Sequence, residues 1–290
     1  MRAKSRKFCA FVCGLDRFGG YAGQKIKRER WIVKIGLNLF SVRNLIQNEK
    51  DLLNAVLELK KSGYDYFQYS GAPFDAQMIA RVSKEADASF CLTHVPMQRI
   101  VEDTDRLMEE HDLFGCKNIG LGGITPKETF ADHDAFRRQV DALEKAAERM
   151  QRNGFTFFYH HHHFEFFKCS GQTALDYMIE NTRAIHFTAD TYWLQYGGVN
   201  VLEYLDKMKG RAECVHLKDY MIVYRGEGAD RDLAPKFAPL GDGVMNFKAI
   251  VAKAKECGAK YFFVEQDDAA DLPDTLGQVA RSAAYAAKEL

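Results

Sequence analysis

Short apolar runs alternate along the chain with segments whose apolar residues recur at helical spacing. The runs are rich in β-branched and aromatic residues. Their nearly continuous apolar character is typical of strands buried on both faces, as in a parallel sheet. The chain contains eight such runs, at residues 32–40, 64–71, 89–96, 116–123, 155–163, 184–190, 213–219 and 261–267.

The segments between the runs indicate amphipathic helices. The clearest has one apolar stripe with charged residues between its members, and it ends at Asn153-Gly154. Eight strand–helix units over about 260 residues predict an α/β protein with a (β/α)8 TIM barrel. The alternative, a doubly wound open sheet, normally carries a Gly-rich phosphate turn after its first strand, which here ends LNLFSVR. The apolar stripe of the helix that ends at Asn153-Gly154 consists of Phe136, Val140, Leu143, Ala147 and Met150.

Two segments fall outside this pattern. Residues 1–30 hold nine Lys/Arg against two acids, which predicts a poorly ordered basic extension before a single barrel domain at 31–290. The extension superficially resembles a signal peptide, but Asp16-Arg17 stands where a small-residue cleavage site is needed. Residues 226–239 are expected to form an irregular loop over the barrel mouth.

The composition argues against several classes of partner. The 40 Lys+Arg residues balance the 40 Asp+Glu residues, and no apolar run approaches the ~20 residues of a membrane span. The seven cysteines show no CxxC spacing, which favours reduced, buried thiols in a cytosolic protein. We therefore expect a cytoplasmic protein with no membrane or nucleic-acid partner; a homo-oligomer is compatible with these features.

Most of the later runs end in residues that can bind metal or transfer protons. A single His or Asp at a strand end is more often a hydrogen-bonded structural group. In a barrel, however, the carboxyl ends of all strands meet at one face, so several such ends indicate a shared site. The ends in question are Thr93-His94, His160 to His163 with Glu165, Asp190, His216 to Asp219, and Glu265 to Asp267.

Motifs in a fixed order resemble the xylose-isomerase-like barrels of sugar phosphate isomerases and epimerases. The resemblance covers about residues 32–285. The fifth-run motif is similar to that family's Tyr-His-Asn-His-Asp-Phe-Glu-Phe pattern, with His161 and His163 in place of Asn and Asp. The motifs are IGLNLFSVR, GYDYFQYSG, YHHHHFEF, DTYWLQYGGVN, VHLKDY, PLGDGVMNF and FFVEQDD.

The resemblance implies one divalent metal ion held by Asp190, His216, Glu265 and a carboxylate from the end of the fifth strand. Either His160 binds the ion directly, or Glu165 reaches back from the loop and leaves His160 for proton transfer; we favour Glu165 as the ligand. Two Glu, one Asp and one His suit Mn²⁺ or Mg²⁺, with Zn²⁺ or Co²⁺ as alternatives.

The alternation of side chains along a strand separates the four consecutive histidines. His160 and His162 are expected on one side, and we assign His162 to substrate binding. His161 and His163 are expected to face the barrel exterior or solvent, without a chemical role.

The resemblance implies a metal-dependent sugar isomerase or epimerase that removes a proton next to a carbonyl through a metal-stabilised enediolate. Glu265 and either His160 or Glu165 are the candidate bases. The substrate is expected to be a sugar or keto-sugar, with no sequence feature that requires a phosphate. Three further side chains are assigned to substrate binding: His94 in the pocket, Trp193 against a sugar face, and Lys218 as a positive charge or a salt-bridge partner.

Three other functions are alternatives to a sugar isomerase or epimerase. A dehydratase or lyase of keto-sugars, keto-glycosides or inososes would use the same metal and the same proton abstraction. A sugar-binding barrel without activity is disfavoured by the nearly complete ligand set. An apurinic endonuclease is a remote alternative, because Trp193 replaces the histidine of the Asp-x-x-His motif that would begin at Asp190, and the acidic barrel lacks a basic face.

Overall fold

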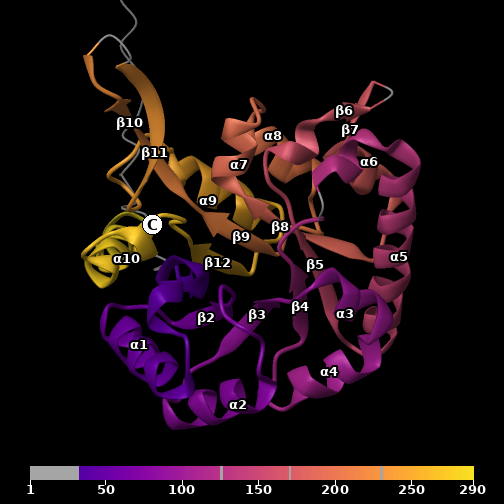
Figure 1. Ribbon diagram of the computed structural model, residues 1–290, viewed down its shortest axis with the longest axis horizontal. Coiled ribbons are helices and arrows are strands. Elements are labelled where there is room, and N and C mark those ends of the chain that lie inside the picture. The colour runs from indigo at the N-terminus through magenta and orange to yellow at the C-terminus, as the bar shows by residue number, and fades with distance from the viewer. Residues whose placement is uncertain (1–32, 125–126, 170, 229–230) are drawn as a thin grey trace, which may run out of the picture. The chain divides into compact units, whose positions relative to one another are not determined.

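Eight parallel strands close into a barrel in the computed structural model (Figure 1). The structure describes residues 33–124, 127–169, 171–228 and 231–290. Each predicted apolar run contains one barrel strand, so the predicted TIM barrel is confirmed. The strands are β1 (Gly36–Asn38), β2 (Tyr66–Tyr69), β3 (Phe90–His94), β4 (Asn118–Leu121), β5 (Thr156–His160), β8 (Ile185–Asp190), β9 (Cys214–Leu217) and β12 (Tyr261–Val264).

Helices cover the outer side of the barrel strands (Figure 1). They bury one apolar stripe each; in α5, for example, all five residues of the predicted stripe are buried. None of the described helices is long and apolar enough to cross a membrane. The α-helices are α1 (Glu49–Lys61), α2 (Ala76–Glu85), α3 (Met97–Glu102), α4 (Thr104–Asp112), α5 (His133–Arg152), α6 (Ala174–Asn181), α7 (Thr191–Tyr196), α8 (Val201–Lys207), α9 (Phe247–Glu256) and α10 (Thr275–Glu289).

Short elements occupy several connections between the strands and helices. In the described part of the chain, four are 3₁₀ helices, and two are small antiparallel sheets, β6 with β7 and β10 with β11. They are η1 (Leu39–Leu45), η2 (Lys127–Ala131), η3 (Phe164–Phe166), η5 (Ala269–Asp271), β6 (Lys168–Cys169), β7 (Gln172–Thr173), β10 (Asp219–Arg225) and β11 (Asp232–Ala238).

The β10–β11 hairpin corrects the prediction of an irregular loop at residues 226–239. Residues 232–238 form strand β11, which pairs with β10 in register from Asp219↔Ala238 to Arg225↔Asp232. Pro235 and the mixed charges hide the strand pattern in the sequence, because the hairpin residues other than Asp219 and Ala238 are at most partly buried. The predicted basic extension at residues 1–30 lies outside the described residues.

A layer of apolar side chains lies directly below the carboxyl end of the barrel. Tyr66, Leu92, Phe158, Cys214 and Phe263 form one buried cluster. Because side chains alternate along a strand, residues two positions further along share the same face. Those residues are Gln68, His94, His160, His216 and Glu265. The fold therefore places an apolar floor beneath a layer of polar side chains.

Candidate metal centre

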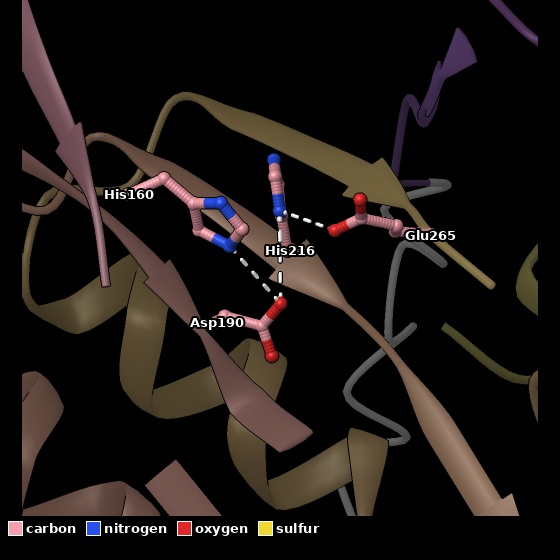
Figure 2. Close-up of side chains that lie close together, drawn as sticks. All are labelled: His160, Asp190, His216 and Glu265. Carbon is pink, nitrogen blue, oxygen red and sulfur yellow. Dashed lines mark hydrogen bonds and ion pairs between the residues drawn. The ribbon is translucent and has the colours of Figure 1, made fainter. Parts of the chain in front are cut away.

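Four buried side chains from four strand ends converge in this polar layer (Figure 2). They are His160 at the end of β5, Asp190 at the end of β8, His216 in β9 and Glu265 just after β12. Each offers one ligand atom, and these four atoms lie within 4.8 Å of one another. The structure thus brings together three of the four predicted ligands, and His160 is the fourth member of the cluster.

Strand register and a helix cap hold Asp190 in this cluster. Asp190 pairs directly across from His216 in the barrel sheet. Its Oδ1 accepts a hydrogen bond from the backbone N–H of Trp193 at 2.9 Å and so caps the N-terminus of α7. Its Oδ2 faces the cluster, 3.3 Å from His160 Nε2 and 3.7 Å from His216 Nδ1. One carboxylate therefore orders the following helix and also offers an oxygen to a metal ion.

The orientation of His216 is fixed from behind by Gln68. The His216 Nε2–H donates to Gln68 Oε1 at 2.7 Å, and the Gln68 amide donates to His94 Nε2 at 2.9 Å. When it is neutral, the His216 ring therefore carries its lone pair on Nδ1, the nitrogen that faces Asp190 and Glu265. Such an outer partner is how proteins orient a metal-binding histidine.

Glu265 is held on both of its oxygens. Its Oε1 accepts a hydrogen bond from Asn38 Nδ2 at 2.8 Å, and its Oε2 lies 2.7 Å from His216 Nδ1. Burial opposes ionisation of this carboxyl, but Lys218 and His216 outweigh it and lower the pKa of Glu265 to about 2. The carboxylate is therefore ionised at neutral pH, as a metal ligand must be.

The buried ammonium of Lys218 lies beside the cluster. Its Nζ is 3.0 Å from Asp190 Oδ2, 3.1 Å from Glu265 Oε2 and 2.9 Å from Asp267 Oδ1. Burial opposes the charged form, yet these three carboxylates raise the pKa of Lys218 above its usual range. Asp219 is not its partner, because that carboxylate accepts backbone N–H groups such as that of Gly241.

The donor atoms of the cluster fit a divalent cation. His216 Nδ1 and Glu265 Oε2 are 2.7 Å apart and form an ion pair when the ring is protonated, and Oε2 also lies 3.1 Å from Lys218 Nζ. A divalent cation among the four donor atoms, which lie within 4.8 Å of one another, would take the place of the proton on His216. The Asp190 and Glu265 carboxylates together carry two negative charges, and Lys218 offsets only one. Two imidazole nitrogens and two carboxylate oxygens form a mixed donor set.

Glu165, which the sequence-based prediction favoured over His160 as the metal ligand, is not a member of this cluster. Its Oε1 accepts a 2.6 Å hydrogen bond from the hydroxyl of Tyr159, and its Oε2 accepts the backbone N–H of His162 at 2.8 Å. The chain leaves the strand after His160 and enters a 3₁₀ helix, η3, which turns the Glu165 side chain back under its own loop.

The four consecutive histidines have different surroundings. His160 and His162 lie close together, with ring centroids 4.5 Å apart, as the alternation predicts. His161 is fully buried, and its Nε2 accepts the backbone N–H of Asp190 at 3.1 Å. His161 therefore holds the backbone of Asp190 in place. The sequence-based prediction assigned no role to His161 and did not include this contact. His163 is exposed and packs against Trp193 and Tyr196.

The predicted substrate-binding side chains line the region next to the cluster. His94 stacks on His160 at 5.2 Å, and Trp193 lies 5.6 Å from the His162 ring. Burial, reinforced by the charge of His216, lowers the pKa of His94 to about 3. Burial also lowers the pKa of His160 and His162 well below their usual value. These rings are therefore neutral at physiological pH, the form in which imidazole binds metal or accepts a proton.

Two residues of the site, Asn38 and Gln68, were not predicted from the sequence, and Asp267 was named only as part of a strand end, without a role. Asn38 holds Glu265, Gln68 holds His216, and Asp267 contacts Lys218. Burial raises the pKa of Asp267 to about 6, with Lys218 acting against this change. Asn38 and Gln68 occur at the ends of the first two strands, so the strand-end criterion used for charged groups would have found them had it included amides.

The comparisons with known proteins agree with the barrel fold. The family model of the xylose isomerase-like TIM barrel matches residues 56–287. Comparison with curated protein sequences gives no match. A solved sugar phosphate isomerase/epimerase from Parabacteroides distasonis is similar over 91% of this chain and 97% of its own, with 20% identity and a TM-score of 0.70.

Two further solved structures share the fold at lower identity. A xylose isomerase-like TIM barrel protein from Mycobacterium smegmatis, in complex with magnesium, is 15% identical, with a TM-score of 0.63 over 88% of this chain and 95% of its own. The probable 3-DHS dehydratase involved in petrobactin synthesis from Bacillus anthracis is 11% identical, with a TM-score of 0.61 over 87% of this chain and 98% of its own. At these identities the likeness concerns the fold.

Proposed function

Because this chain belongs to the xylose isomerase-like TIM barrel family, we propose that it is a metal-dependent sugar isomerase or epimerase. The observation that carries the proposal is the buried cluster of His160, Asp190, His216 and Glu265, at the end of the barrel where such enzymes act. The solved sugar phosphate isomerase/epimerase with the same fold supports the substrate class.

We propose that the four cluster residues hold one divalent ion. A bound ion would polarise a sugar carbonyl and so acidify the neighbouring C–H bond. With His160 in place of Glu165, the donors are two nitrogens and two oxygens rather than mainly oxygen. Magnesium prefers oxygen ligands, whereas manganese, cobalt and zinc also accept imidazole. We therefore favour Mn²⁺, Co²⁺ or Zn²⁺ over Mg²⁺ for this chain.

Glu265 is the candidate base of the cluster, because His160 as a metal ligand has no free nitrogen lone pair to accept a proton. Figure 2 shows His160 and Glu265 on opposite sides of the cluster, with His216 between them. Two bases on opposite faces of one carbon are what epimerisation requires, and one base that serves neighbouring carbons gives isomerisation. Asn38 would orient the Glu265 carboxylate, and the ammonium of Lys218 would stabilise negative charge on a substrate oxygen.

A dehydratase or lyase of keto-sugars, keto-glycosides or inososes is the second candidate. It begins with the same proton abstraction and then expels a leaving group from the adjacent carbon. Lys218 favours this alternative, because a buried ammonium beside Glu265 can stabilise a departing oxygen. The stereochemistry and fate of the substrate distinguish the two activities.

Metal analysis and hydrogen exchange together test the proposal. The purified protein should contain about one divalent ion per chain, as one four-donor cluster implies. A panel of ketoses, keto-glycosides and inososes in heavy water should then identify a substrate whose α-carbon gains deuterium. A new stereoisomer means epimerase, whereas loss of water or aglycone means lyase.

A pair of Glu→Gln variants provides the control. Glu265→Gln should abolish both metal binding and exchange. Glu213→Gln removes a carboxylate that also lies 2.7 Å from a histidine, His186, but outside the cluster, so it should leave both unchanged. Absence of a divalent ion, or full exchange in Glu265→Gln, would contradict the proposal.

A further inference from the structure

Thr191 comes directly after the cluster residue Asp190 and is fully buried. Its hydroxyl makes two hydrogen bonds, both to the backbone of the neighbouring strand end. Thr191 Oγ1 donates to the backbone carbonyl of His216 at 3.0 Å and accepts the backbone N–H of Lys218 at 3.3 Å. One hydroxyl therefore joins the chain next to Asp190 to the backbone on both sides of the strand end that carries His216.

These two contacts occur where the ladder between β8 and β9 ends. The last pair of that ladder is Asp190↔His216, and the chain then turns from β8 into α7, which begins at Thr191. If the parallel ladder continued, the backbone of residue 191 would donate its N–H to the His216 carbonyl and accept the Lys218 N–H on its own carbonyl. The Thr191 hydroxyl makes both contacts in place of the backbone.

This replacement allows β8 to end at the cluster without leaving β9 unpaired. The hydroxyl satisfies a backbone carbonyl and an N–H of β9 and the residue after it, and buried backbone groups without a partner are costly. Asp190 is then free to cap α7 with Oδ1 and to present Oδ2 to the cluster. The turn into the helix and the geometry of the cluster therefore depend on the same side chain.

We propose that Thr191 is a positioning residue for the metal centre. Its hydroxyl fixes the separation of the β8 and β9 ends, and with it the place of Asp190 Oδ2, which is 3.7 Å from His216 Nδ1 and 3.0 Å from Lys218 Nζ. Zinc-like ions bind nitrogen and oxygen ligands at about 2.0–2.2 Å, so a small shift between two ligands weakens binding. The binding of an ion rests on the proposed function, whereas the bridge between the strand ends rests on the hydrogen bonds of Thr191.

The metal affinities of Thr191→Val and Thr191→Ser test this inference. Valine keeps the shape of the side chain but can neither donate nor accept a hydrogen bond, whereas serine retains the hydroxyl. Competition with a chromogenic chelator for Mn²⁺ or Co²⁺ should show about 10- to 100-fold weaker binding in Thr191→Val, the usual effect of losing a residue that supports a ligand. Thr191→Ser should recover most of the affinity. A serine variant as weak as the valine variant would assign the effect to the methyl group and overturn the inference.

Thr182→Val provides the matched control. Thr182 is also buried and precedes the amino end of β8; its hydroxyl donates to the carbonyl of Met178 at 2.6 Å and accepts from Arg211 Nη1 at 3.1 Å. This variant loses buried hydrogen bonds of the same kind and should keep the affinity of the wild type. With Co²⁺ bound, the visible absorption spectrum, which depends on ligand geometry, should change in Thr191→Val alone. Equal affinity in the two valine variants overturns the inference.

Hydrogen exchange of the Lys218 amide separates this inference from the proposed function. In the metal-free protein, this N–H should exchange about 10-fold faster in Thr191→Val, measured against the amides of β3, because it loses its acceptor. An unchanged ratio to the β3 amides would show that the hydroxyl does not hold the strand ends together. A wild-type protein that binds no divalent ion, but whose Lys218 amide responds as expected, would contradict the proposed function alone.

Discussion

Gln68 Oε1 lies 2.7 Å from His216 Nε2, at the bottom of the candidate metal centre. Both side chains are fully buried, and the amide of Gln68 continues the contact to His94. The residue that orients the histidine therefore comes from β2, which β12 and β1 separate from β9 in the closed barrel, and it is 148 positions away in the chain. This contact leads to the first prediction.

Gln68→Leu should weaken metal binding by about 10- to 100-fold, the usual effect of losing a partner behind a metal-binding histidine. The substitution keeps the size of the side chain but removes the acceptor that fixes the His216 ring. A competition titration with a chromogenic chelator measures the change. Gln98→Leu removes an amide that bonds Glu102 at the surface and should leave the affinity unchanged. Unchanged affinity in Gln68→Leu would show that the ring needs no such support.

His160 and Glu165 should differ in their effect on metal content. His160→Ala removes one of the four donors and should reduce the bound ion well below one per chain. Glu165→Gln should retain the ion. It should lower the free energy of unfolding by about 1–3 kcal/mol, because the backbone N–H of His162 and the hydroxyl of Tyr159 lose their charged acceptor. Elemental analysis and urea unfolding measure the two effects. The reverse result for metal content would restore Glu165 as the ligand.

Lys218→Met should destabilise the metal-free protein by about 3–5 kcal/mol. The change leaves the buried carboxylates of Asp190 and Glu265 without their positive partner. A saturating divalent ion should recover part of this loss, since the ion supplies positive charge at the same oxygens. Urea unfolding with and without Mn²⁺ measures both effects. Lys207→Met removes a partly exposed ion pair with Asp176 and should cost about 1 kcal/mol or less.

The metal-free protein should lose stability as the pH falls from 6.5 toward 4. Burial lowers the pKa of His94 to about 3, and of His111 and His161 to about 4, from the ordinary value of 6.5. In this range the unfolded chain binds more protons at these residues than the folded chain. Each therefore removes about 1.4 kcal/mol of stability per pH unit on acidification.

His216 acts in the opposite direction. Burial opposes its charged form, but Glu265 and Asp190 raise its pKa, so it stabilises the fold below pH 6.5 and loses this effect as the pH rises through its folded pKa. Asp267 acts in the same direction as His216, because burial raises its pKa to about 6. The buried histidines outnumber these two groups, and the net change should follow the histidines. Urea unfolding at pH 7, 6 and 5 measures the slope, which His111→Gln should reduce by about one histidine's share. Equal stability at pH 5 and pH 7 would contradict this prediction.

Part of the site could be predicted because strand geometry is regular. The apolar runs locate the eight strands, and the closed barrel brings all their carboxyl ends to one face. Asp190 and His216 lie within their strands, and Glu265 comes directly after one, so the alternation of side chains directs all three toward the barrel interior. For residues in or next to a strand, sequence position and direction of the side chain are linked.

Beyond the end of a strand, sequence position no longer predicts the direction of a side chain. There the tertiary structure determines it. The chain turns into η3 after the fifth strand, so the spacing between His160 and Glu165 no longer indicates where the second side chain points. Packing against Tyr159 placed Glu165 under its loop, and closure of the barrel placed Gln68 behind His216 and Lys218 among three carboxylates. The sequence alone determined the fold and three members of the cluster. Its fourth member and its supports depend on contacts between loops and strands far apart in the chain, which local periodicity does not encode.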